Sequence, residues 1–217
     1  MRKTIIIMMT FCTISSLGQK DSVVQGLEYD GGRYEGEVQN GNPHGSGRIL
    51  YASDDPVRLG YDGNWVNGKK HGQGVMYWRN FDRYEGNWKD DLEDGEGICT
   101  NVNGNKYEGQ WKNGVEDGEG TFYYGNGDKY VGSWKNGLWN GKGCYYKHDG
   151  HEYCGTWEST VEWETGKVII ECKNEEGHTF FSMCQSGSRD INLGTHILNK
   201  TMWSKIRIYI NKYNRTN

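Results

Sequence analysis

The chain has 217 residues, a formal net charge of −4 at pH 7 and 33 glycines, about 15% of the sequence. With Ala52 as the single alanine, this excess of glycine excludes a mainly helical domain, because each glycine inside a helix costs about 1 kcal/mol relative to alanine. The 9 Trp and 15 Tyr exclude a disordered linker. The composition therefore predicts an all-β protein with many tight turns and a largely aromatic core.

Residues 1–18 have the layout of a secretory signal peptide. Arg2 and Lys3 precede the apolar run from Thr4 to Leu17, and small residues follow up to Gly18. The run is shorter than the roughly 20 residues that a membrane-spanning helix needs. We expect cleavage after Gly18 and a secreted or periplasmic protein. The alternatives are a buried first strand or an uncleaved anchor, in which case the protein is cytoplasmic or membrane-anchored.

A repeat of 23 residues organises residues 19–157, with copies that start near residues 34, 61, 84, 107, 130 and 153. Each tyrosine that opens a copy is followed two residues later by Gly and, except at Val38, four residues later by Trp. Glycine pairs recur 11 and 13 residues after the tyrosine, and Asn-Gly follows the Trp in most copies. The first two copies are 27 residues apart, which places a four-residue insertion near Ala52 to Gly60.

The spacing of each copy predicts its structure. Residues 0, 2 and 4 of a strand face the same side, so the Tyr and Trp rings lie over the glycine between them and over glycines of the neighbouring strand. Asn-Gly dipeptides predict hairpin turns. Because one hairpin is not stable alone, the units must stack into an elongated antiparallel sheet whose aromatic ladder is its thin core.

The pattern Tyr-x-Gly-x-Trp-x-x-Gly-x-x-x-Gly-x-Gly resembles the MORN (membrane occupation and recognition nexus) repeat, from about Tyr34 to Trp157. The pairs His44-Gly45 and His71-Gly72 also match that family. The resemblance implies a twisted antiparallel β-sheet that binds proteins or lipids, or scaffolds an attached domain, without chemistry in the repeat itself. The departures from the pattern are Val38, Asp91 in place of a turn glycine, and Phe81 in place of the glycine of the second turn.

Charge restricts the partners of the repeats. Between Tyr29 and Trp157, 14 Lys and Arg face 20 Asp and Glu, a balance of −6 that excludes nucleic acid and disfavours acidic membranes. A protein or glycan partner fits better, because rows of Trp and Tyr offer flat contact surface. In the competing interpretation, about three in four of these rings belong to the core. The candidate binding residues are Tyr61, Trp65, Tyr84, Trp88, Tyr107, Trp111, Tyr130, Trp134, Tyr153 and Trp157.

The sequence beyond Trp157 changes character. Residues 158–189 read as a small β cap, with strands at 161–164, 167–172 and 178–183. Residues 190–217 carry five cations against Asp190 alone, and from about Thr195 the apolar residues follow a helical period. We expect a basic amphipathic helix that docks on its own acidic sheet. The alternatives are binding to a partner and contact of residues 195–217 with an anionic membrane.

The cysteines favour one disulfide. Cys144 and Cys154 are symmetric about Asp149, so they face each other across a hairpin. The rival is a zinc site with His148 and His151, although the spacing matches no standard finger. A second pair, Cys172 and Cys184, has less support.

No catalytic motif is present in the sequence, and neither a cofactor nor a metal is expected. The sequence therefore predicts an exported, non-catalytic protein-binding or scaffolding module. The alternative is a phospholipid-associated MORN protein that its basic carboxyl-terminal helix or an uncleaved amino terminus holds at the membrane.

Overall fold

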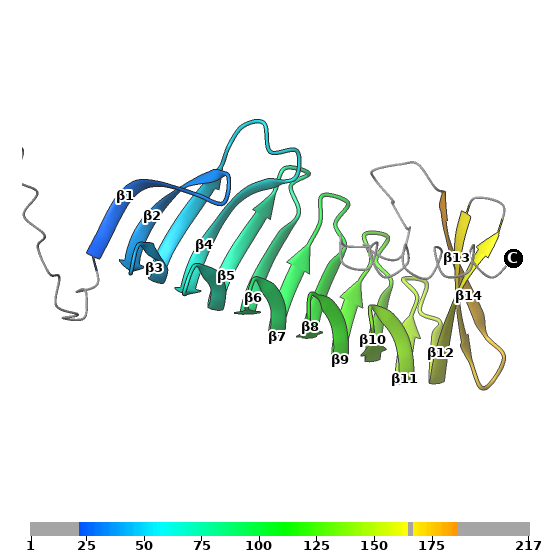
Figure 1. Ribbon diagram of the computed structural model, residues 1–217. Coiled ribbons are helices and arrows are strands. Elements are labelled where there is room, and N and C mark those ends of the chain that lie inside the picture. The colour runs from blue at the N-terminus through cyan, green and yellow to red at the C-terminus, as the bar shows by residue number, and fades with distance from the viewer. Residues whose placement is uncertain (1–21, 165–166, 186–217) are drawn as a thin grey trace, which may run out of the picture.

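The computed structural model describes residues 22–164 and 167–185, which form one antiparallel sheet of 14 strands in sequence order (Figure 1). The strands are β1 (Ser22–Tyr29), β2 (Gly32–Gln39), β3 (Asn42–Tyr51), β4 (Arg58–Val66), β5 (Lys69–Trp78), β6 (Arg83–Lys89), β7 (Leu92–Thr100), β8 (Lys106–Lys112), β9 (Val115–Tyr123), β10 (Lys129–Lys135), β11 (Leu138–Tyr146), β12 (Glu152–Glu164), β13 (Lys167–Asn174) and β14 (Thr179–Gln185). The predicted all-β sheet of stacked hairpins is confirmed. The predicted signal peptide and carboxyl-terminal helix lie outside the described residues.

The Asn-Gly turns form as the sequence predicts. In the turn after Trp111, Asn113 has φ of 51° and Gly114 has φ of 80°, the pair of positive values that a tight hairpin turn requires. The amide of Gly114 also donates a hydrogen bond to the Glu93 carbonyl in the preceding repeat, at 2.8 Å. Asp91 keeps this geometry with φ of 72°, and its amide donates to the Lys70 carbonyl at 3.0 Å. The turns of successive repeats are thereby joined.

Glycine is required beneath each tyrosine because nothing larger fits there. A Cβ on Gly120 would overlap the ring of Tyr107, and a Cβ on Gly109 would lie 2.5 Å from the Cα of Gly120. Gly109 and Gly120 are paired across β8 and β9, so the two glycines bring the backbones and the ring together. The same overlap recurs with the tyrosine that opens each of the other full repeats and its partner glycine: Tyr34 with Gly47, Tyr61 with Gly74, Tyr84 with Gly97, and Tyr130 with Gly143.

The aromatic ladder is held by hydrogen bonds as well as by packing. Tyr107 Oη donates to the Gln110 carbonyl at 2.9 Å, and Trp111 Nε1 donates to the Gly97 carbonyl of the preceding repeat at 3.1 Å. The Tyr107 ring meets Trp111 and Trp134 edge to face, each at a centroid distance of 5.2 Å. The rings form one continuous core, because four tyrosines each contact the tryptophans of two repeats: Tyr61, Tyr84, Tyr107 and Tyr130.

The two ends of the sheet differ from the repeats. At the first end, Tyr29 packs edge-on against Trp65 and donates from its hydroxyl to the Gly68 carbonyl at 2.9 Å. At the other end, β12 continues past Trp157 to Glu164 and pairs with β13, which pairs with β14. The three strands agree with the strand segments predicted for this region. No helix in the described part of the chain has the length and apolarity to cross a membrane.

Candidate functional site

The rings proposed as a contact surface are mostly interior. Nine of the ten are at most 6% exposed, and Tyr153 is partly buried. Side chains buried to this degree offer almost no area to a partner, so the interpretation of these rows as core replaces their interpretation as a binding surface. Any surface that binds a partner would have to consist of other residues of the sheet. The buried nine are Tyr61, Trp65, Tyr84, Trp88, Tyr107, Trp111, Tyr130, Trp134 and Trp157.

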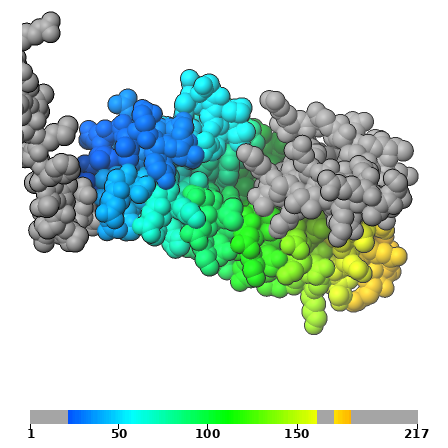
Figure 2. Space-filling model, in the orientation of Figure 1, coloured from blue at the N-terminus to red at the C-terminus, as the bar shows by residue number. Residues whose placement is uncertain are grey.

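Two departures from the repeat pattern lie next to each other in the connections at one end of the strands. The four-residue insertion lies in the loop between β3 and β4, the tall cyan loop in Figure 1, and this segment also projects in the space-filling view (Figure 2). The neighbouring turn between β5 and β6 contains Phe81. The Arg79 amide of that turn donates to the Val57 carbonyl of the loop at 2.9 Å. The insertion and the unusual turn are therefore direct neighbours.

Hydrogen bonds fix the conformation of the β3–β4 loop. The Arg79 guanidinium donates to the Ala52 carbonyl at 2.6 Å and to the Asp55 carbonyl at 2.5 Å. Asp55 accepts hydrogen bonds from the amides of Arg58 and Val57, which together lower its pKa to about 2. Arg58 also pairs with Asp30 and lies 3.9 Å above the Tyr51 ring. The loop is thus tied to the β1–β2 turn on one side and to the β5–β6 turn on the other.

Apolar side chains are exposed on this fixed scaffold. Phe81 is 78% exposed, and Val57 and Leu59 are exposed by 42% and 41%. We call Val57, Leu59 and Phe81 the apolar loop patch. The sequence marks both the insertion and Phe81 as departures from the repeat, but residue spacing alone does not show that they touch. The missing signal is the hydrogen bonding of Arg79, which joins residues more than twenty positions apart.

Phe81 has an unfavourable backbone conformation. Its φ is 68°, whereas the matching residues of the next three repeats, Gly104, Gly127 and Gly150, have φ of 79°, 92° and 92°. All four amides donate to the carbonyl three residues earlier, so the turns have the same geometry. A left-handed conformation costs a residue with a Cβ roughly 1–2 kcal/mol, and glycine does not incur this cost.

Phe81→Gly should therefore raise the free energy of unfolding by about 1 kcal/mol. Val102→Gly is the matched control, because Val102 is also exposed in a turn, by 65%, but has no positive φ. We expect the control to lose stability slightly, since glycine adds entropy to the unfolded chain. Urea titrations of both variants measure the difference. Equal shifts would show that Phe81 is not strained.

A buried carboxyl group lies beside the ladder. Glu116 stands opposite Trp111 in the β8–β9 pair and is 7% exposed. Burial away from water raises its pKa from 4.5 to about 7, and the nearby Glu93 adds to this increase. Burial also raises the pKa of Glu93, which stands opposite Trp88 one repeat earlier. The ionised forms of these groups therefore destabilise the fold.

The stability of the protein should fall as pH rises from 5 to 8. Because the folded state holds the Glu116 proton more tightly than the unfolded state, this contribution is complete below pH 4.5 and is lost as the pH passes about 7. We expect a loss of about 2 kcal/mol. Glu116→Gln should remove most of this slope in melting experiments across the range, while Glu119→Gln, at an exposed site, should retain it. A slope that Glu116→Gln leaves unchanged would assign the effect to other groups.

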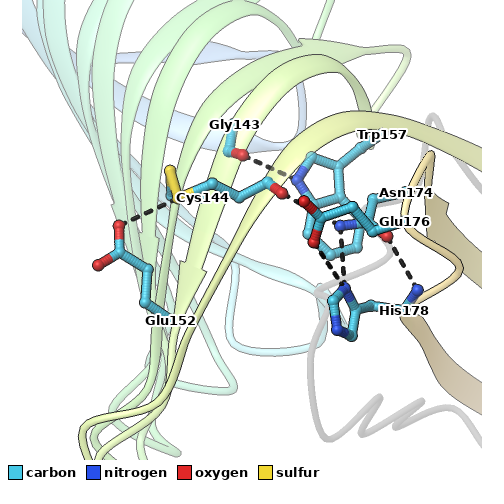
Figure 3. Close-up of a disulfide and its surroundings, with 8 residues drawn as sticks. Gly143, Cys144, Glu152, Trp157, Asn174, Glu176 and His178 are labelled. Carbon is cyan, nitrogen blue, oxygen red and sulfur yellow. Dashed lines mark hydrogen bonds and ion pairs between the residues drawn. A yellow bond between two sulfur atoms is a disulfide. The ribbon is translucent and has the colours of Figure 1, made fainter.

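Cys144 and Cys154 stand opposite each other in the β11–β12 pair and form a disulfide in the structure, the one that their symmetry about Asp149 predicts. Trp157 donates to the Gly143 carbonyl beside it at 2.9 Å (Figure 3). The histidines of the alternative zinc site point to carboxylates instead: His148 Nδ1 lies 2.9 Å from Asp128, and His151 Nδ1 lies 2.9 Å from Asp149. Bonded to each other, the two cysteines offer no thiolate to a metal, and among the described residues the group beside their sulfur atoms is Glu152 and neither histidine.

The second cysteine pair does not form. Cys172 stands opposite Phe180 in the β13–β14 pair, whereas Cys184 stands opposite Val168. Cys172 is a buried free thiol that accepts a hydrogen bond from Ser159 Oγ at 3.1 Å. The register of this hairpin therefore separates the two residues, and the prediction of a Cys172–Cys184 disulfide is wrong.

Comparisons with known proteins follow the repeat boundaries. The model of the MORN repeat matches residues 34–55, 61–83, 84–106, 107–129 and 130–152. The search of curated proteins found no match. One similar solved structure is the TCP domain of SAS-4 (dCPAP) of Drosophila melanogaster in complex with a proline-rich motif of Ana2 (dSTIL), with a TM-score of 0.36 and 12% identity over 83% of this chain and 97% of that chain. Because the five matched repeats cover more than half of its residues, this chain belongs to the MORN repeat family.

Proposed function

We propose that this protein is an exported, non-catalytic protein-binding or scaffolding module. MORN repeats are consistent with a protein-binding or a membrane-associated module. The observation that favours a protein partner is the pairing of cations on the sheet surface. Arg48 pairs with Glu35 at 2.8 Å, Arg83 with Glu85 at 2.6 Å, and Lys106 with Glu108 at 2.9 Å.

Paired cations are poor ligands for phosphate. Recognition of phospholipid headgroups or nucleic acid requires clustered positive charge, and here each of these cations already has a carboxylate on its own strand or on the paired strand. The acidic balance of −6 between Tyr29 and Trp157 works in the same direction. A protein partner requires no such cluster, because a typical protein interface combines an apolar centre with a polar rim.

Export is supported by two independent features. The segment 1–18 has the order of charged, apolar and small residues of a signal peptide. The Cys144–Cys154 disulfide fits an oxidising compartment, since disulfides are rare in a reducing cytosol. Mass spectrometry of the mature protein tests this part of the proposal. An amino terminus at residue 19 and a peptide linked through Cys144 and Cys154 would support export, and an intact residue 1 with free thiols would contradict it.

The membrane-associated alternative rests on the basic composition of residues 190–217. Co-sedimentation of the full chain with phosphatidylserine vesicles tests it, with Lys200→Gln, Lys205→Gln and Arg207→Gln combined as the comparison. Binding that salt weakens and this variant loses would favour the membrane function. For the protein-binding function, we expect no vesicle binding and specific recovery of a partner from the native compartment, identified by mass spectrometry.

A further inference from the structure

The apolar loop patch combines two features that the fold does not need. Phe81 is 78% exposed and has φ of 68°, at a position where the next three repeats have glycine. Glycine would remove both the strain and the exposed ring without altering the hydrogen bond of the turn, since Gly104 makes the same bond. A strained residue that packing does not explain is a recognised mark of a functional position.

The patch is organised before any partner arrives. Arg79 of the Phe81 turn donates to the carbonyls of Ala52 and Asp55, and the Asp55 carboxylate accepts from the amides of Val57 and Arg58. These bonds hold the turn and the loop together as one unit. A surface fixed in this way loses little conformational entropy on binding, which favours its use in recognition.

The charges around the patch define the rim of the partner. The three arginines beside it are engaged: Arg58 with Asp30 and Asp55, Arg79 with two carbonyls, and Arg83 with Glu85. Asp54, in the same loop, is exposed. Hydrogen bonds to carbonyls leave Arg79 charged, but the five carboxylates near the patch, Asp30, Asp54, Asp55, Asp82 and Glu85, outnumber the three arginines by two. The surroundings of the patch therefore carry net negative charge, which disfavours anionic lipid and favours basic residues around the docking site.

The shape and size of the patch favour insertion into a pocket. The β3–β4 loop projects beyond the ends of the strands (Figures 1 and 2). The exposed apolar side chains of the patch come from this loop (Val57), from the start of β4 (Leu59) and from the neighbouring β5–β6 turn (Phe81). Three side chains are a small surface relative to the roughly 800 Å² that each partner buries in a standard stable interface. Symmetric pairing of two copies through this patch would be weak, whereas a single aromatic anchor in a pocket can dominate the affinity of an interface.

We propose that Phe81 is the anchor of an interaction surface, and that it inserts into an apolar pocket of a partner protein whose rim is basic. This inference rests on the proposed protein-binding function and adds the place and the chemistry of the contact. Val57 and Leu59 add exposed apolar side chains on the neighbouring loop and strand, and Arg79 positions the loop.

Site-specific photo-crosslinking of the full chain tests the proposal. Phe81→p-benzoylphenylalanine is expressed in the native host and irradiated, with Val131→p-benzoylphenylalanine as the control at a site that is 39% exposed on β10. The crosslinked protein is identified and purified, and its affinity is then measured for the unmodified chain, Phe81→Gly and Val131→Thr. We expect one protein to crosslink from position 81 alone. We also expect Phe81→Gly to weaken its binding at least about tenfold and Val131→Thr to leave it unchanged.

Several results would contradict the proposal that Phe81 is an anchor. These are adducts at position 81 with lipid only or with a second copy only, no adduct beyond the Val131 control, or a purified partner that binds Phe81→Gly as tightly as the unmodified chain. Because Phe81→Gly is expected to be more stable than the unmodified chain, lost binding does not report unfolding. A partner that binds the unmodified chain and Phe81→Gly equally would contradict the role of Phe81 as an anchor but would leave the protein-binding function standing. Binding to vesicles alone would contradict both proposals.

Discussion

Gly109→Val should lower the free energy of unfolding by about 3 kcal/mol or more, the upper end of what overpacking usually costs. A Cβ at this position meets the backbone of Gly120 at 2.5 Å and the Glu119 carbonyl oxygen at 2.6 Å. Backbone cannot move aside as a flexible side chain can, so the β8–β9 pair must separate locally. Separation of this pair also displaces Tyr107, whose hydroxyl would lie 2.8 Å from the new Cβ.

Lys112→Ala is the matched control for Gly109→Val, because it alters an exposed residue of the same strand. Surface substitutions of this kind usually change stability by no more than about 0.5 kcal/mol. Denaturant unfolding and melting of the two variants give the comparison. Equal melting temperatures would show that the glycines do not make room for the tyrosine rings.

Trp111→Ala should cost about 3–5 kcal/mol, because it removes a ring that is 6% exposed from the middle of the ladder. The cavity lies between Tyr84 and Tyr107, each of which meets the Trp111 ring edge to face. Neither tyrosine can close the cavity, since both are held by hydroxyl bonds to their own strands, to the carbonyls of Asn87 and Gln110.

Trp111→Phe separates packing from hydrogen bonding at the same position. Phenylalanine retains a ring but loses the bond from Nε1 to the Gly97 carbonyl, and it leaves that buried acceptor without its indole donor. We expect a loss of about 1–3 kcal/mol, smaller than that of Trp111→Ala. Urea unfolding followed by circular dichroism gives both values. A loss for Trp111→Phe as large as for Trp111→Ala would assign the whole effect to the hydrogen bond.

The 23-residue period predicts most of the fold. Parity places Tyr, Gly and Trp on one side of a strand, and Asn-Gly dictates the turns, so strand order follows from local sequence. The hairpin register follows only in part, because it shifts between Gly109, which stands opposite Gly120, and Trp111, which stands opposite Glu116. The sequence also predicts that the Tyr107 ring packs on a glycine of the next strand, as it does on Gly120, because a ring beside a glycine has few other places to lie. The period alone does not determine how exposed the side chains of one sheet face are. For this reason the sequence allows the rings to be interpreted either as core or as a binding surface.

Contacts between residues far apart in the chain could not be predicted from the sequence, for physical reasons. The contact between the inserted loop and the Phe81 turn depends on an arginine that bonds to carbonyls, and carbonyls carry no sequence signal. The raised pKa of Glu116 depends on burial beside Trp111, while the charge pattern alone presents that residue as one of many surface carboxylates. The failed Cys172–Cys184 pairing depends on the register of a hairpin whose turn has no Asn-Gly to fix it.

Hydrogen exchange of the tryptophan indole N–H groups tests the buried ladder most directly. In Trp65, Trp88, Trp111, Trp134 and Trp157, Nε1 donates to a glycine carbonyl of the preceding repeat, at 2.9–3.2 Å. NMR of the native protein resolves these signals individually. A core of this kind predicts strong protection from exchange for the indoles in the middle of the array, Trp88, Trp111 and Trp134, with release only on unfolding. Exchange of these three indoles at the rate of free indole would contradict a buried ladder and would indicate that the rings are exposed on the surface.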